Sequence, residues 1–201
     1  MPATAFRRLA FALLAAVAVA LPLPALSVDA GQPAPAFALP RAAGDVLTLE
    51  SLKGRVVLVD FWASWCAPCK RSFPWMNELQ RKYGEQGLAV VAINVDKRRA
   101  DADRFLAQVP ANFDVVFDPD GKTPAAYAVR GMPSSYLVDA RGNVVEVEAG
   151  FNDQRAAAFE ARIRALVSRA APGKDSPNGS ALARAGRMTA GFRVKARVGR
   201  A

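Results

Sequence analysis

A buried-strand pattern ends directly before the only two cysteines of this 201-residue chain. Residues 55–62 read Arg-Val-Val-Leu-Val-Asp-Phe-Trp, an apolar run rich in β-branched residues that predicts a central strand covered on both faces. Residues 65–70 (Trp-Cys-Ala-Pro-Cys-Lys) follow it and open a predicted helix. Two thiols three residues apart at a strand-to-helix junction can close a disulfide, and a helix N-terminus can stabilise the thiolate of the first. The pattern therefore predicts a redox-active dithiol.

Other uses of Cys66 and Cys69 fit the sequence less well. A zinc site takes about four Cys or His ligands, whereas the chain offers two cysteines and no histidine. A purely structural disulfide across so short a loop would stabilise the fold little. The remaining alternative is an intermolecular Cu(I) or zinc thiolate site, as in a metal chaperone. We expect no cofactor and no resident metal.

The N-terminal residues 1–30 predict a signal peptide. Two arginines precede Leu9–Leu21, a stretch without a polar side chain, and two prolines follow it. A basic segment, an apolar segment of this length and helix breakers before small residues are typical of cleavable export signals. The alternative is an uncleaved anchor, because residues 9–28 carry no charge. In either case we expect the body to face an exported compartment, and a bacterial periplasm is the prediction.

Residues 169–201 form a second appendage, rich in Ala, Gly, Ser and Arg. They hold eight basic residues against the single acidic Asp175, and Arg7 and Arg8 supply the rest of the net charge of +9, so residues 29–168 balance at 17 basic and 17 acidic side chains. The high net charge therefore says nothing about the central domain. We predict a solvated tail without regular structure, with weak attraction to anionic lipid as the alternative. We expect no nucleic-acid binding.

Residues 31–168 predict one α/β domain with its own core. The expected elements, in chain order, are a hairpin over 37–39 and 46–49, a strand over 55–61, a helix from 66 to about 83, a strand over 88–95, helices over 99–109 and 123–127, strands over 135–138 and 144–148, and a closing helix over 155–167. A short apolar piece at 115–117 is not counted among the strands. This order predicts a mixed central sheet with helices on both faces.

Two separate motifs resemble those of known redox proteins. Residues 59–70, followed by Pro74, resemble the active-site region of thioredoxins. Residues 127–139 (Tyr-Ala-Val-Arg-Gly-Met-Pro-Ser-Ser-Tyr-Leu-Val-Asp), the leader, the N-terminal hairpin and the turn at 118–121 narrow the resemblance to exported thiol–disulfide oxidoreductases of the TlpA/ResA type within the thioredoxin-like superfamily. The resemblance covers roughly residues 34–168. It implies a thioredoxin fold with an extra N-terminal β-hairpin and a central insertion.

The expected roles at the dithiol follow from its position. Cys66 is expected to be the exposed, attacking thiol, because a helix N-terminus lowers its pKa. Cys69, deeper on the same face, would then attack the mixed disulfide and release the product. Ala67 and Pro68 lie between the cysteines and tune the redox potential, and Pro68 is expected in the first helical turn, where its missing N–H is tolerated. Trp65 is expected to flank Cys66 on the partner surface, and Ala67 and Pro68 are expected to contact the substrate as well.

Three more residues are expected at the site. Asp60 is an acid at the end of an apolar run, and the resemblance places it beneath the dithiol as the proton acceptor for Cys69. The alternative is an exposed carboxylate at the end of the strand. The resemblance also implies that Pro133 is cis and sits against the disulfide, while backbone groups of Met132 pair with an extended substrate segment.

We expect an exported thiol–disulfide oxidoreductase that mainly reduces disulfides of partner proteins. Apocytochrome cysteines or a copper-assembly protein are the expected substrates, and a membrane electron donor would recharge the dithiol. Ser72 stands where many relatives carry a carboxylate, and Asp60 where many have asparagine, which leaves a specialised role in cytochrome c maturation open. The Ala-Pro pair lacks the histidine that strong oxidases use. A dithiol oxidase and a Cu(I) chaperone are the alternatives.

Overall fold

The computed structural model of this protein describes residues 28–170. Five strands form one sheet in the order β5-β4-β3-β6-β7, and β1 and β2 form a separate two-stranded hairpin. The strands are β1 (Ala38–Pro40), β2 (Val46–Thr48), β3 (Val56–Trp62), β4 (Leu88–Asn94), β5 (Asp114–Phe117), β6 (Ser134–Val138) and β7 (Val144–Ala149). Because β3 is parallel to β4 and antiparallel to β6, the sheet is mixed.

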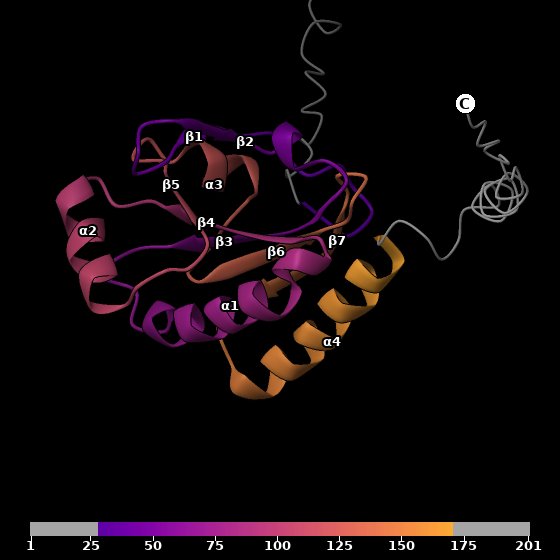
Figure 1. The fold of residues 1–201 in the computed structure, drawn as a ribbon. Coiled ribbons are helices and arrows are strands. Elements are labelled where there is room, and N and C mark those ends of the chain that lie inside the picture. Colours follow the sequence, from indigo (N-terminus) through magenta and orange to yellow (C-terminus); the bar gives the residue numbers. More distant parts are fainter. Residues whose placement is uncertain (1–27, 171–201) are drawn as a thin grey trace, which may run out of the picture.

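Helices cover both faces of this sheet. Figure 1 shows α1 (Cys69–Tyr83) and α4 (Asp153–Ala170) beneath the sheet, and α3 (Lys122–Ala126) with the β1–β2 hairpin above it. α2 (Arg99–Gln108) contributes Ala102 and Phe105 to the core on the α1 side. Two short 3-10 turns, Glu50–Leu52 and Gly84–Gln86, complete the regular structure of the described residues. The predicted mixed sheet with helices on both faces and an N-terminal hairpin is confirmed.

The continuous apolar run of β3 is explained by its position at the centre of the sheet. All seven residues of β3 are buried, because alternate side chains enter the two cores on opposite faces. Leu58 and Trp62 join the core that holds α1 and α4, whereas Val59 and Phe61 join the core under the hairpin and α3. Each such burial contributes about 1.5–3 kcal/mol. β4 is buried along its whole length in the same way.

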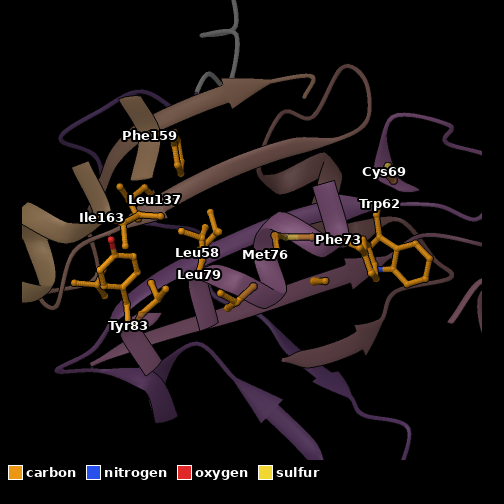
Figure 2. Packing of buried hydrophobic residues seen from close by; sticks show 14 of the residues in the cluster. Leu58, Trp62, Cys69, Phe73, Met76, Leu79, Tyr83, Leu137, Phe159 and Ile163 are labelled. Carbon is orange, nitrogen blue, oxygen red and sulfur yellow. The ribbon is translucent and has the colours of Figure 1, made fainter. Parts of the chain in front are cut away.

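The core between the sheet and α1 also reaches the cysteines. In Figure 2, Trp62 and Cys69 lie at one end of this core, and Tyr83 and Ile163 lie at the other. Trp62 packs edge-on against Phe73, with ring centroids 4.9 Å apart. The disulfide segment is therefore packed against the main apolar core.

Two expected boundaries are wrong. Residues 114–117 form a strand, β5, which extends the sheet as a parallel neighbour of β4. The helix predicted from Cys66 begins at Cys69, because Cys66 and Ala67 are held in a turn in which the Cys69 N–H donates to the Cys66 carbonyl at 3.1 Å. The predicted central insertion corresponds to residues 95–132, which hold α2, β5 and α3.

The structure does not test the predictions for the two ends of the chain. The predicted signal peptide or anchor up to residue 27, and the predicted tail from residue 171, lie outside the described residues. Within residues 28–170, no helix combines the length and the apolar character needed to cross a membrane.

Candidate active site at the Cys66–Cys69 disulfide

The two cysteines form a disulfide where β3 gives way to α1. The Sγ–Sγ distance is 2.03 Å and the Cα–Cα distance is 5.4 Å. Pro68 caps α1 with φ of −63°, a conformation that its ring favours. Behind it, the Ser72 N–H donates to the Pro68 carbonyl at 3.2 Å. Cys66 thus lies just before the N-terminal turn of α1, which carries a partial positive charge.

Cys66 is less accessible than the sequence predicts. Its exposed fraction is 4 % and that of Cys69 is 0 %. The expectation of an exposed Cys66 is wrong for this disulfide form, because both cysteines belong to the apolar core together with Trp62. Exposed surface is provided instead by the neighbouring Trp65, which is 72 % exposed, and by Ala67.

A buried polar network holds the loop that leads to Cys66. The Asp96 carboxylate accepts hydrogen bonds from the Ser64 N–H at 2.9 Å, from Ser64 Oγ at 3.0 Å and from Asn94 Nδ2 at 2.8 Å. Asp96 itself is buried. Since Asn94 ends β4 and Asp96 follows it, the end of β4 fixes the loop after β3. No role for these residues was predicted, although Asn94 and Asp96 place two polar side chains at the end of an apolar run.

Asp60 is completely buried in the centre of β3. This position excludes the alternative of an exposed carboxylate at the strand end. Ser135 Oγ donates to Asp60 Oδ1 at 2.6 Å, and Asp60 Oδ2 has no hydrogen-bond partner among the described residues. Burial raises the pKa of Asp60 to about 7, although the Ser135 hydrogen bond acts in the opposite direction. The group can therefore gain or lose a proton near neutral pH.

The alternation of side chains places Asp60 on the same sheet face as the cysteines. Residues two apart in a strand share a face, and both Leu58 and Trp62 belong to the core that contains Cys66 and Cys69. Asp60 lies between these two residues in the strand. It is therefore on the face covered by α1, as the resemblance implies.

The loop before β6 reaches the same end of the sheet. Ser134 pairs with Phe61 across β3 and β6, so Met132 and Pro133 lie beside the end of β3 from which the cysteine loop emerges. The Met132–Pro133 peptide bond is cis, as the resemblance implies. Pro133 is buried, and Met132 is half-buried against the core that contains both cysteines.

Ser135 is a further polar residue of the site that the sequence analysis missed. From the sequence alone, a serine within a predicted strand gives no indication of a functional role. Only its register opposite Asp60, together with the hydrogen bond at 2.6 Å, identifies it. Ser72, at the position where many relatives have a carboxylate, is buried and donates to the Cys69 carbonyl at 3.1 Å.

Within residues 28–170, no group of three or more His, Cys, Asp or Glu side chains could hold a metal ion. The sulfur atoms of both cysteines are joined to each other. The arrangement is a disulfide at the edge of a core, a buried carboxylate on the same sheet face, and an exposed tryptophan next to the first cysteine.

Comparisons with known proteins agree with this chemistry. The Redoxin family profile matches residues 29–163. The chain is 36 % identical over 124 residues to the thiol-disulfide oxidoreductase ResA of Bacillus subtilis. The aligned region covers 62 % of this chain and 69 % of that protein. It is 37 % identical over 116 residues to ResA of Bacillus cereus, covering 58 % and 67 % respectively.

Solved structures show the same fold. A crystal structure from Chlorobium tepidum, assigned as thiol:disulfide interchange protein DsbE, is 51 % identical with a TM-score of 0.68, and covers 70 % of this chain and 99 % of that one. A second Chlorobium tepidum structure, a thiol:disulfide interchange protein of the thioredoxin family, is 26 % identical with a TM-score of 0.59, covering 68 % and 96 %. This chain therefore belongs to the Redoxin family and is a thiol–disulfide oxidoreductase with a thioredoxin-like fold.

Proposed function

We propose that this protein works mainly as a reductant, passing electrons from the Cys66/Cys69 dithiol to disulfides of other exported proteins. The observation that carries the exchange chemistry is the buried Asp60 carboxylate on the dithiol face, whose pKa burial raises to about 7. A base with a pKa near the working pH suits proton transfer in both directions. The site can thus deprotonate a thiol near neutral pH.

The proposed reaction has two thiol–disulfide exchange steps. The Cys66 thiolate attacks the partner disulfide, forms a mixed disulfide and releases the first partner thiolate. Asp60 then takes the proton of Cys69. The Cys69 thiolate attacks Cys66 Sγ, the bond seen in the structure forms, and the second partner thiolate leaves. Two electrons have passed from the dithiol to the partner.

The residues between the cysteines support the reducing direction. A strong oxidant is one whose reduced form is stabilised, as in DsbA. Here Ala67 and Pro68 carry no charge, and the whole chain lacks histidine. A dithiol oxidase is the competing function, and it would need another source of stabilisation for the Cys66 thiolate.

The proposed partner surface surrounds the disulfide. Trp65 and Ala67 are exposed beside Cys66, and an exposed tryptophan is a typical anchor for a protein partner. Met132 and Pro133 lie beside the end of β3, where backbone groups could pair with an extended segment of the substrate. Pro68 completes this rim. The proposed partners are proteins with accessible disulfides, and apocytochromes or a copper-assembly protein are the candidates.

Location in the periplasm is part of the proposal. The predicted signal peptide over residues 1–30, or an anchor over residues 9–28, supports export. In an oxidising compartment a reductant must be recharged, so we propose a membrane electron donor as second partner. Weak contact of the basic residues 169–201 with anionic lipid is compatible with this location.

The direction of the reaction can be tested by a redox titration. Purified protein is equilibrated in glutathione buffers, and the fraction of dithiol is read from the fluorescence of its tryptophans or by thiol alkylation. We expect a reduction potential close to about −270 mV, the value of thioredoxin. A potential near about −120 mV, the value of DsbA, would assign the protein as an oxidase instead.

A further inference from the structure

We propose that Ser135 and Glu148 form a proton relay that connects Asp60 to solvent through a small cavity next to Trp75. The inference rests on the proposed function, because the relay carries the proton that Asp60 takes from Cys69. It assigns a role to two residues on different strands, neither of which touches the reacting sulfur atoms.

The three residues form one row across the sheet. Asp60 of β3 lies opposite Ser135 of β6, and Ser135 lies opposite Glu148 of β7. Residues opposite each other in neighbouring strands share a face, with Cβ atoms about 4.5–5.5 Å apart. On the other side of Asp60 the row continues with Ala92, which is apolar. Polar groups therefore lead from the buried carboxylate in one direction only, towards the edge strand β7.

Asp60 needs such a connection because it is sealed from solvent. It is completely buried, and the only hydrogen bond of its carboxylate within the described residues comes from Ser135 Oγ, at 2.6 Å from Oδ1. A proton accepted there can leave only through a group that both accepts and donates. A hydroxyl does both, so Ser135 is the first member of the relay.

A cavity joins Ser135 to Glu148. Its volume is about 10 Å³, and its lining includes Ser135, Glu148, Trp75 and Phe159. This is near the lower limit of the roughly 10–15 Å³ that one water occupies. Trp75, another residue of the lining, has a buried Nε1 with no hydrogen-bond partner among the described residues. A single water there could bridge the serine hydroxyl and the glutamate.

Glu148 is the solvent end of the row. Its Oε1 atom is buried and lies 2.6 Å from Arg155 Nη1, while the side chain as a whole is 23 % exposed and that of Arg155 is 55 % exposed. Arg155 is the charged group that α4 directs at Glu148. The next charged pair along β7 is Glu146 with Arg162, 3.3 Å apart. Glu148 thus has one side in the cavity and another in contact with solvent.

The relay moves one proton and no electrons. Asp60 passes its proton to Ser135 Oγ as the hydroxyl passes its own proton through the cavity to Glu148, which releases a proton to solvent. Asp60 returns to the carboxylate form, and the serine is again a hydroxyl. When the dithiol is regenerated, the same groups carry one proton inwards.

The test compares variants in single-turnover reduction of a small aromatic disulfide by the pre-reduced protein at pH 7. We expect Glu148→Gln and Ser135→Ala each to slow the step in which Cys69 closes the ring by about 3- to 10-fold, since general acid–base groups contribute up to about 10²–10⁴-fold. The double variant should be no slower than either single variant, because the residues act in series. Ser135→Thr, which keeps the hydroxyl, should restore the rate.

Glu146→Gln is the matched control. It removes a carboxylate from the same strand, also paired with an arginine of α4, but Glu146 lies opposite Leu137 rather than Ser135. Its rate should stay within about twofold of the wild type, because the Glu146–Arg162 pair is weak and solvent-accessible and lies outside the row of Asp60, Ser135 and Glu148.

Chemical rescue separates a relay from a structural effect. Imidazole at constant pH and ionic strength should restore the rate of Glu148→Gln, because a soluble base can replace the group at the surface, but not that of Ser135→Ala, whose defect is buried. Wild-type rates in both variants, or a slow Glu148→Gln that imidazole leaves unchanged, would overturn the relay. If Asp60→Asn were slow while both relay variants reacted at the wild-type rate, the relay would be wrong and the proposed function would still hold. If the reduced wild-type protein did not reduce disulfides at all, both proposals would be wrong.

Discussion

The buried Asp60 carboxylate lowers the stability of the fold when it is ionised, yet the proposed reaction needs its ionised form as a base. In the folded protein its pKa is raised from 3.8 to about 7 by burial. Between these pH values the folded chain keeps a proton that the unfolded chain has lost. The resulting stabilisation is fully present below about pH 4 and is lost as the pH rises through 7, a change of up to about 4 kcal/mol.

The substitution Asp60→Asn should therefore stabilise the protein more at high pH than at low pH. Asparagine keeps an oxygen that can accept the Ser135 hydrogen bond but never carries a charge. We expect a gain in the free energy of unfolding close to zero at pH 4 that grows to as much as about 4 kcal/mol at pH 8. Urea unfolding of the oxidised proteins at both pH values measures it. A gain that does not change with pH would show that Asp60 is ionised at a much lower pH.

The division of labour between the two cysteines is also a property of single residues. If Cys66 attacks and Cys69 resolves, Cys69→Ser should accumulate a covalent mixed disulfide with the natural partner, because the attacking thiol remains and the resolving thiol is gone. Non-reducing gels of periplasmic extracts, followed by mass spectrometry of the adduct, would detect it. Cys66→Ser is the control, and more adduct with that variant than with Cys69→Ser would reverse the two roles.

At the scale of elements, the long helices and strands could be predicted from their hydrophobic periodicity, whereas one short strand and one helix boundary could not. The apolar runs of β3 and β4 and the amphipathic α4 are long, so their existence followed from pattern alone. β5 has four residues, of which only Val116 and Phe117 are buried, too few to distinguish a strand from a loop. The start of α1 was placed three residues early, since propensity does not show that Cys66 and Ala67 form a turn.

The loop from β3 to α1 depends on an element far from it in sequence. The buried Asp96 carboxylate accepts from both Ser64 donors and from Asn94 Nδ2. Asp96→Ala would leave these donors unpaired, and each buried unpaired polar group costs about 1–3 kcal/mol. We expect a loss of about 3 kcal/mol in the free energy of unfolding of the oxidised protein.

The control for this prediction is Ser64→Ala. It removes only the hydroxyl donor and leaves the backbone hydrogen bond at 2.9 Å in place, so it should cost about 1 kcal/mol. Chemical unfolding of both variants under the same conditions gives the comparison. Equal losses would mean that neither the backbone bond of Ser64 nor the Asn94 bond contributes to the stability of the loop.

At the scale of the whole molecule, the active site is assembled from segments that the sequence separates widely. The motifs at 59–70 and 127–139 could be recognised singly, and their resemblance to a known family implied that they meet. The row of Asp60, Ser135 and Glu148 could not be predicted in this way, because it depends on the pairing of β3 with β6 and of β6 with β7. A shift of one residue in either pairing would turn these side chains to the opposite face.

The last helix of the described domain is anchored by contacts within residues 28–170. α4 ends at Ala170, and Phe159, Ile163 and Val167 are buried in the core beneath the sheet. Deleting residues 171–201 should therefore change the melting temperature by less than about 2 °C, no more than the shift of a 1 kcal/mol loss in a chain of this length, and should leave the rate of disulfide reduction unchanged. A longer deletion from residue 160 removes Ile163 and Val167, and it should unfold the protein or lower its melting temperature by more than about 10 °C. Calorimetry and a reduction assay on both truncated proteins provide the measurement. A drop of more than about 5 °C for the shorter deletion would mean that the basic segment contributes at least about 1 kcal/mol to the folded domain.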